Sequence, residues 1–360
     1  MNNKIINILL FSIIIVAIFP LSAIADTSVI KCLKFSEIES LIPSHNSTAK
    51  GSFNSYDEAT DIKSNGITAI NGLLAQWSTV NIAYAGGDGT NPKDEAAISY
   101  LLNAQKTSLQ QQLNSFADMD INKTALNVQK GTNSLIWNME MIYISYNAIS
   151  IQLEDLLVKK SLAERQLQIA KMQDKIGMAT DLAVAEAEYS VMELESNVQK
   201  LVESKKSIIQ QFNINLDQEY DTELVICDVP DVTANQISDI KVDDDYLAYQ
   251  SYSYDVKLDA NSDSSKRKFK NDFYRTYQTI LDKQKALKVE QKKLITAEKK
   301  LKVAQLKYDI GSISLLQLEL EKSAYSSQKS TTEITKDTLA QAYRQYEWAK
   351  KGLIVSSVES

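Results

Sequence analysis

The sequence predicts an all-α protein made of two repeats of a long antiparallel, coiled-coil-like helical hairpin, with little or no β-structure. Three observations lead to this prediction: helix breakers are scarce, apolar residues recur in steps of three and four, and one turn motif occurs twice. The 360 residues include 10 glycines and 4 prolines, far below the roughly 7% and 5% of average proteins. Scarce breakers favour long uninterrupted helices.

Apolar residues form four long seams along the chain. The first seam runs from Met141 to Ile176 in steps of three or four, and only Asp155 and Arg165 interrupt it. Three further seams cover residues 191–212, 280–308 and 339–353. A repeat of 3.5 residues is what helices need when they pack lengthwise against neighbours. The seams therefore predict four long helices that pack side by side.

A turn motif occurs twice between these seams. Gly177 and Gly311 each follow an isoleucine at the end of a charged, heptad-patterned helix, and Thr180 or Ser314 follows three residues later. Glycine supplies the left-handed C-cap that ends one helix, and a threonine or serine oxygen caps the next helix. Each motif therefore predicts a hairpin tip, and the two copies indicate an internal duplication.

The chain divides into four segments on this reading. Residues 1–25 are typical of a secretory signal peptide, with Lys4, an apolar stretch from Ile5 to Leu21 and a small-residue cleavage site ending at Ala25. An uncleaved membrane anchor is the alternative. The first hairpin repeat is expected over 26–215, a linker with one short strand over 216–245, and the second repeat over 246–360. The second repeat is expected to open with a helix over 246–258 and a polar return loop from Asn261.

The two cysteines lie far apart in the sequence. Cys32 is near the expected mature N-terminus and Cys227 is in the linker. Export permits a disulfide between them, which would join the start of the chain to the junction between the repeats. Two unpaired thiols are the alternative, because sequence alone does not show proximity.

The sequence carries none of the usual patterns of catalysis or nucleic-acid binding. The net charge is −7 and the chain has a single histidine, so no basic nucleic-acid surface is expected. No Cys/His set has metal-ligand spacing, and no glycine-rich phosphate loop is present. We therefore expect a protein that is not an enzyme and has no cofactor or metal.

Around the two glycines the sequence resembles the TolC-like outer membrane efflux protein (OEP) family. The tip pattern of that family is an aromatic residue, glycine three positions later, serine or threonine after another three, and a leucine-rich helix. The second motif matches it with Tyr308, Gly311 and Ser314, and the first with Gly177 and Thr180. The resemblance covers roughly residues 120–215 and 265–355.

The resemblance implies a homotrimer in which each subunit gives four helical strands to a twelve-helix α-barrel. The tips would face a periplasmic-type adaptor and an inner-membrane or ABC pump, and Tyr308 would stand where some members carry a tip-closing aromatic. The acidic constriction of those members is not reproduced, since Gln317 and Leu320 occupy the corresponding places. The chain also lacks sequence for the family's transmembrane β-barrel strands, because the segment from Asn261 is short and polar.

The sequence thus predicts a TolC-like component of an efflux or type I secretion system. It would be exported to the cell envelope, the outer membrane or periplasm where the host has two membranes, and would form a helical duct with docking tips. Gly177, Thr180, Tyr308, Gly311 and Ser314 are the residues expected at these tips; local capping alone is the other interpretation. The alternative function is a non-conducting coiled-coil spacer or interaction protein.

Overall fold

Long helices make up nearly all of the part of the chain that the computed structural model describes, namely residues 32–84, 92–227 and 229–355. The predicted signal peptide lies outside these residues. The helices are the short α1 (Ile38–His45), α6 (Ala234–Ser238), α7 (Val242–Tyr249) and α8 (Tyr254–Leu258), and the long α2 (Ser47–Tyr84), α3 (Pro92–Ala117), α4 (Ile121–Lys175), α5 (Asp181–Asn215), α9 (Asp263–Asp309) and α10 (Leu315–Lys350). Two 3₁₀ turns, Phe35–Glu37 and Gln250–Tyr252, and two short strands complete the described elements. The predicted all-α fold of long hairpins is confirmed.

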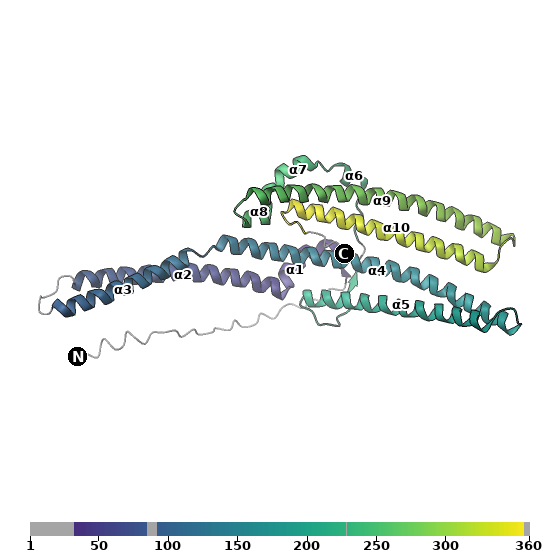
Figure 1. Ribbon diagram of the computed structural model, residues 1–360, viewed down its shortest axis with the longest axis horizontal. Coiled ribbons are helices and arrows are strands. Elements are labelled where there is room, and N and C mark those ends of the chain that lie inside the picture. Colours follow the sequence, from purple (N-terminus) through teal and green to yellow (C-terminus); the bar gives the residue numbers. More distant parts are fainter. Residues whose placement is uncertain (1–31, 85–91, 228, 356–360) are drawn as a thin grey trace. The chain divides into compact units, whose positions relative to one another are not determined.

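Two long hairpins pack against each other in the described chain. Helix α4 packs against α5 in the first hairpin, and α9 packs against α10 in the second (Figure 1). Helix α10 also packs along α4, so the four helices follow one another in the order α5, α4, α10, α9. Helices α5 and α9 are therefore the outer members of this four-helix layer.

The first repeat contains an additional hairpin before its central pair. Helix α2 packs against α3, and both α1 and α2 contact α4. Pro92 opens α3 at the position where a missing N–H costs nothing. Helix α4 begins at an N-cap, Asp120, whose carboxylate accepts the Lys123 N–H at 2.9 Å.

The polar residues that interrupt the first seam lie at the contact between the two repeats. Arg165 on α4 pairs with Glu319 on α10 at 2.6 Å, and Asp155 accepts a hydrogen bond from Ser327 at 2.9 Å. Asp155 is buried, so the hydrogen bond from Ser327 satisfies a carboxylate that would be costly to bury alone. The interruptions therefore join the hairpins to each other.

A two-stranded parallel sheet ties the start of the described chain to the linker. Strand β1 (Cys32–Leu33) pairs with β2 (Val225–Ile226), with Cys32 opposite Val225. The buried Tyr143 of α4 donates its hydroxyl toward the carbonyls of Cys227, at 2.6 Å, and Leu33, at 3.1 Å. The short strand expected in the linker is present, and the linker also contains α6 and the start of α7.

The entry to the second repeat differs from the sequence expectation. Residues 246–258 are not one helix: α7 ends at Tyr249, and α8 begins only after a 3₁₀ turn. The polar segment from Asn261 is not a loop, because Ser262 is the N-cap of α9 and the helix begins at Asp263. Repeated serines and charges resemble a loop, but Ser262 and Asp263 are also favoured at a helix start.

Helix α7 is fixed to the second hairpin by its acidic first turn. The Tyr274 hydroxyl donates to Asp243 at 2.6 Å, and the Tyr346 hydroxyl donates to Asp245 at 2.5 Å. The tyrosine Tyr246 packs among the rings of α9. Burial, together with the hydrogen bond to Asp245, raises the pKa of Tyr346 above its usual range. The acidic run therefore contributes both to the helix dipole and to tertiary packing.

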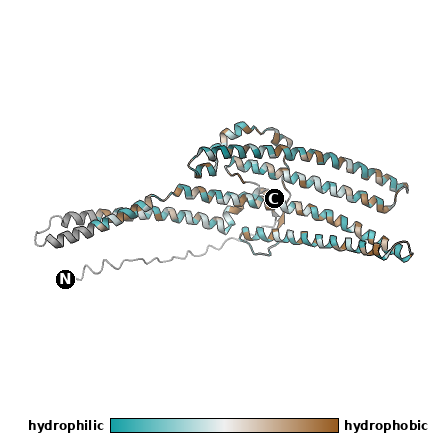
Figure 2. Cartoon of the chain, in the orientation of Figure 1, coloured by the Kyte–Doolittle hydropathy of each residue, from teal (hydrophilic) through white to brown (hydrophobic). Residues whose placement is uncertain are grey.

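Along the coloured parts of the helices, apolar residues alternate with polar ones and do not gather into one continuous apolar stretch (Figure 2). Within the described residues, no helix combines the length and the apolar character that crossing a membrane requires. A buried cluster joins α9 and α10 to α6 of the linker and to α8; its members are Ile237, Val256, Phe269, Phe273, Ile280, Leu339, Ala342, Tyr346 and Ala349.

Candidate functional site

The first hairpin reverses direction at Gly177. This glycine has φ of +72°, and the N–H of Met178 donates to the carbonyl of Gln173 at 2.8 Å. That bond is the six-to-one link of a Schellman motif, which satisfies a carbonyl left over at the helix end. Thr180 then opens α5, because its side-chain oxygen accepts the Ala183 N–H at 3.2 Å.

The second hairpin reverses in the same way at Gly311. Its φ is +71°, and the N–H of Ser312 donates to the carbonyl of Lys307 at 2.7 Å. Ser314 caps α10 by accepting the Gln317 N–H at 3.2 Å, while the Gln317 side chain accepts the Ser314 N–H at 3.0 Å. This capping box has no counterpart at the first tip. A Cβ added at Gly177 or Gly311 would meet no atom within 4 Å, so both glycines are required for backbone conformation and not for close packing.

Large apolar side chains are exposed around both reversals. Ile310 is 80% exposed, Met178 74% and Ile176 69%. Tyr308 is less open, at 37%, and it continues the seam of α9 that faces α10. Soluble proteins rarely leave contiguous apolar patches without a partner. The further exposed apolar residues near the tips are Met172, Leu182, Tyr189, Met192, Leu306 and Leu315.

An ion cluster around one buried glutamate connects the two repeats at the opposite end of the α4–α10 contact. Glu140 on α4 is only 1% exposed. It receives two hydrogen bonds from Arg344 on α10, at 2.5 and 2.7 Å, and one from the Trp348 indole N–H at 2.7 Å. Arg344 also contacts Glu39 of α1 at 2.9 Å, and Lys351 pairs with Glu39. We refer to these five residues as the inter-repeat ion cluster.

The charges of this cluster perturb one another. Burial would lower the pKa of Arg344, but its hydrogen bonds and proximity to Glu140 and Glu39 outweigh burial, and the pKa is raised. Burial would raise the pKa of Glu39, but hydrogen bonds from Lys351 and Arg344 outweigh it, and that pKa is lowered. Both shifts favour the ionised forms of Arg344 and Glu39, and the cluster joins α1, α4 and α10 at one point.

A second buried carboxylate lies on α10 between the tips and the ion cluster. Both oxygens of Asp337 accept hydrogen bonds from the side-chain amide of Asn147 on α4, at 2.9 and 3.1 Å. Burial raises the pKa of Asp337 to about 6, although the Asn147 bonds oppose this, and the negative charges of Glu333 and Asp231 raise it further. The carboxylate therefore contributes a pH-dependent term to the packing of α10 on α4.

The structure places Cys227 close to the backbone of Cys32. The Cys227 N–H donates to the carbonyl of Leu33 at 3.0 Å, so Cys227 directly follows β2 and lies beside the strand that begins at Cys32. Among the described residues Cys227 is not a free thiol. The Cys32 side chain lies outside the described residues, so its pairing with Cys227 stays a prediction, which the backbone arrangement favours.

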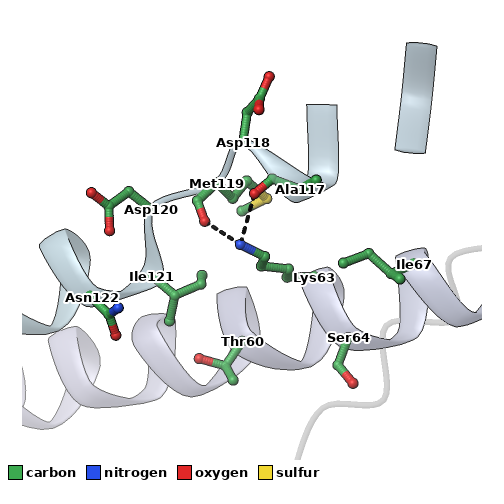
Figure 3. A pocket seen from close by; sticks show the side chains of 10 residues that line it. All are labelled: Thr60, Lys63, Ser64, Ile67, Ala117, Asp118, Met119, Asp120, Ile121 and Asn122. Carbon is green, nitrogen blue, oxygen red and sulfur yellow. Dashed lines mark hydrogen bonds between the residues drawn. The ribbon is translucent and has the colours of Figure 1, made fainter. Parts of the chain in front are cut away.

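Lys63 fixes the junction between α3 and α4. Figure 3 shows its amine reaching from α2 to the carbonyl oxygens of Ala117, at 3.1 Å, and Met119, at 2.5 Å. A cation at a helix C-terminus satisfies leftover carbonyls and interacts favourably with the helix dipole. Lys63 lies in a shallow pocket that is lined by residues between Thr60 and Ile67 of α2 and between Ala117 and Asn122 at the junction. We interpret this pocket as part of the helix junction and not as a ligand site.

The residues predicted from sequence thus separate into two groups. The five tip residues lie at the two hairpin ends, and the cysteines lie at the small sheet. The ion cluster, Asp337 and Lys63 were missed, because a lone glutamate or arginine in a heptad pattern is normally a solvated charge. The described residues contain no group of three or more acidic, histidine or cysteine residues that could hold a metal ion.

These elements define a class of protein: a subunit made of two antiparallel hairpins, capped alike, whose tips lie at one end of a four-helix layer. The outer-membrane channel OprN is similar in structure, with a TM-score of 0.52 and 11% identity over 88% of this chain and 90% of that chain. CusC, described for transmembrane channel formation, has a TM-score of 0.49 at 11% identity over 88% and 96%. The Campylobacter jejuni CmeC outer membrane channel has a TM-score of 0.42 at 11% identity over 89% of each chain.

No family model and no curated protein matches the sequence. The likeness to OprN therefore establishes the fold and nothing finer. The predicted resemblance to TolC-like outer membrane efflux channels is confirmed at the level of the fold.

Proposed function

We propose that this chain is a TolC-like subunit of an efflux or type I secretion system that forms a helical duct with docking tips in the cell envelope. The observation that carries the proposal is the pair of capped tips at one end of the four-helix layer, with exposed Ile176, Met178 and Ile310. Apolar side chains in such a position are stabilised when a partner covers them. The partners expected are a periplasmic-type adaptor and an inner-membrane or ABC pump.

A duct also requires that copies of the chain join along their length. The order α5, α4, α10, α9 leaves one flank of α5 and one flank of α9 without a neighbouring long helix in the described chain. Three copies joined at these flanks would form a closed wall of twelve helices, as the family resemblance implies. In this proposal the chain supplies walls and docking surfaces and performs no catalysis.

The proposal is tested by complementation in a host strain that lacks the chain. Loss of the chain should raise the cellular retention of a fluorescent efflux dye or of a secreted polypeptide. The wild-type chain should restore export, whereas a double variant with Ile176→Asp and Met178→Asp should fold but fail to restore it. Leu247→Asp is the matched control, because Leu247 is 66% exposed on α7, away from the tips.

Two results would contradict the proposal. Full complementation by the folded tip variant would show that the tips are not docking surfaces. Unchanged retention in the strain without the chain would favour a non-conducting coiled-coil spacer.

A further inference from the structure

The two tips do not end at the same height. Arg165, which pairs with Glu319, lies twelve residues before Gly177, whereas Glu319 lies eight residues after Gly311. Asn147 and its partner Asp337 give the same difference of four residues. The first tip therefore projects about 6 Å beyond the second, at roughly 1.5 Å per residue.

Helix α5 carries a second seam on the side away from α4. The seam toward α4 is partly buried and contains Val184, Ala187, Val191, Leu194, Val198 and Leu201. On the opposite side Leu182, Ala185, Tyr189 and Met192 follow one another in steps of three and four, and all four are exposed. A helix that packs on one neighbour alone does not need this second apolar seam.

Helix α9 carries a corresponding seam on the side away from α10. Its seam toward α10 contains Ile280, Leu287, Leu294 and Leu301, whereas Val289, Val303, Leu306 and Ile310 are exposed on the other side. Three of these, Val289, Val303 and Ile310, fall in one heptad position. Both outer helices of the layer thus present apolar residues with a coiled-coil repeat.

We propose that α5 of one copy packs antiparallel against α9 of the next copy, with Leu182 opposite Ile310 and Tyr189 opposite Val303. The inference rests on the proposed duct and specifies which surfaces join its subunits and in which register. In a ring whose axis follows the helices, neighbouring copies stand at equal height. The four-residue offset of the tips then brings Leu182, five residues after Gly177, level with Ile310, one residue before Gly311. The same offset brings Tyr189 level with Val303.

Charges flanking the two seams are complementary in this register. Glu186 and Glu193 on α5 fall beside Lys307 and Lys300 on α9, and all four side chains are exposed. Within the chain as far as it is described, none of the four takes part in an ion pair, whereas Glu188 and Glu195 of α5 are already paired with Lys171 and Lys160 of α4. Contact between two different surfaces of identical subunits is heterologous and closes into a ring when the rotation permits.

Cysteine cross-linking between differently tagged, co-expressed copies tests the register. Copies carrying Leu182→Cys should cross-link to copies carrying Ile310→Cys, and Tyr189→Cys to Val303→Cys. The matched control pairs Leu182→Cys with Val289→Cys, which the register separates by roughly 30 Å along the helix, so this pair should not cross-link.

Charge exchange tests the electrostatic part. Glu186→Lys with Glu193→Lys should lower the assembled fraction about tenfold at low salt, and Lys300→Glu with Lys307→Glu in the same chain should restore it. Suppose that the wild-type chain is a trimer but that the in-register cysteine variants stay unlinked, or cross-link no better than the control pair. That result would overturn this register but not the duct. A chain that is monomeric, or whose cysteines link only to a different protein, would overturn both.

Discussion

Replacing Arg344 with methionine tests whether the inter-repeat ion cluster holds the two hairpins together. Methionine keeps an unbranched apolar stem without the guanidinium group, and it leaves Glu140, which is 1% exposed, with the Trp348 indole N–H as its remaining partner. Removing one partner of a buried ion pair typically costs about 3–5 kcal/mol. Arg344 is itself partly open and one hydrogen bond remains, so the lower end, about 3 kcal/mol, is expected.

A double variant separates the net stabilisation by the Arg344–Glu140 pair from the free-energy penalty of leaving one buried charge unpaired. Arg344→Met combined with Glu140→Leu removes both charges. It also leaves the Trp348 indole N–H without its acceptor and Glu39 without one of its two cationic partners. Such a replacement of a buried pair by apolar residues is often close to neutral, so it should cost about 1–2 kcal/mol, less than Arg344→Met alone. Urea unfolding followed by helical circular dichroism, at equal assembly state, measures both values. A cost below about 1 kcal/mol for Arg344→Met, or additive costs, would refute this reasoning.

Gly352→Ala should lower the free energy of unfolding by about 3 kcal/mol or more, and Gly311→Ala by about 1–2 kcal/mol, as measured by thermal unfolding. Both glycines have positive φ, but only at Gly352 would an added Cβ lie 2.1 Å from a backbone carbonyl oxygen. Equal losses of stability would contradict this reasoning. Asp337 has a pKa raised to about 6, so its contribution to stability is present below its ordinary pKa and is lost as the pH rises through about 6. Asp337→Asn should therefore stabilise the protein by about 1–3 kcal/mol at pH 7.5 and not at pH 4. A difference in stability that does not change with pH would contradict the assignment. Unreduced, denatured protein should accept no thiol alkylation at Cys32 or Cys227, and Cys227→Ser should lower the unfolding free energy by about 2–5 kcal/mol; labelling of both thiols by mass spectrometry would exclude the disulfide.

The hairpins and their reversals could be predicted from sequence because the signals are local. The conformation of Gly311 and the cap at Ser314 depend on a few consecutive residues. The seams depend only on a repeat of 3.5 residues. For these features sequence distance and spatial distance are nearly the same.

The contacts between the repeats could not be predicted in the same way. Glu140 and Arg344 are 204 residues apart, and each alone has the pattern of a solvated helix charge. The third left-handed glycine, Gly352, was missed because no repeated motif surrounds it, although it ends α10 as Gly177 ends α4. The start of α9 was misplaced because serine and aspartate serve both as loop residues and as helix caps.

The mass of the purified, processed chain in solution tests the account most directly. Light scattering behind size-exclusion chromatography, over a range of protein concentration and at low salt, should give three times the subunit mass. A monomer at the highest concentration would contradict the duct, because the exposed seams of α5 and α9 would then have no second copy to cover them.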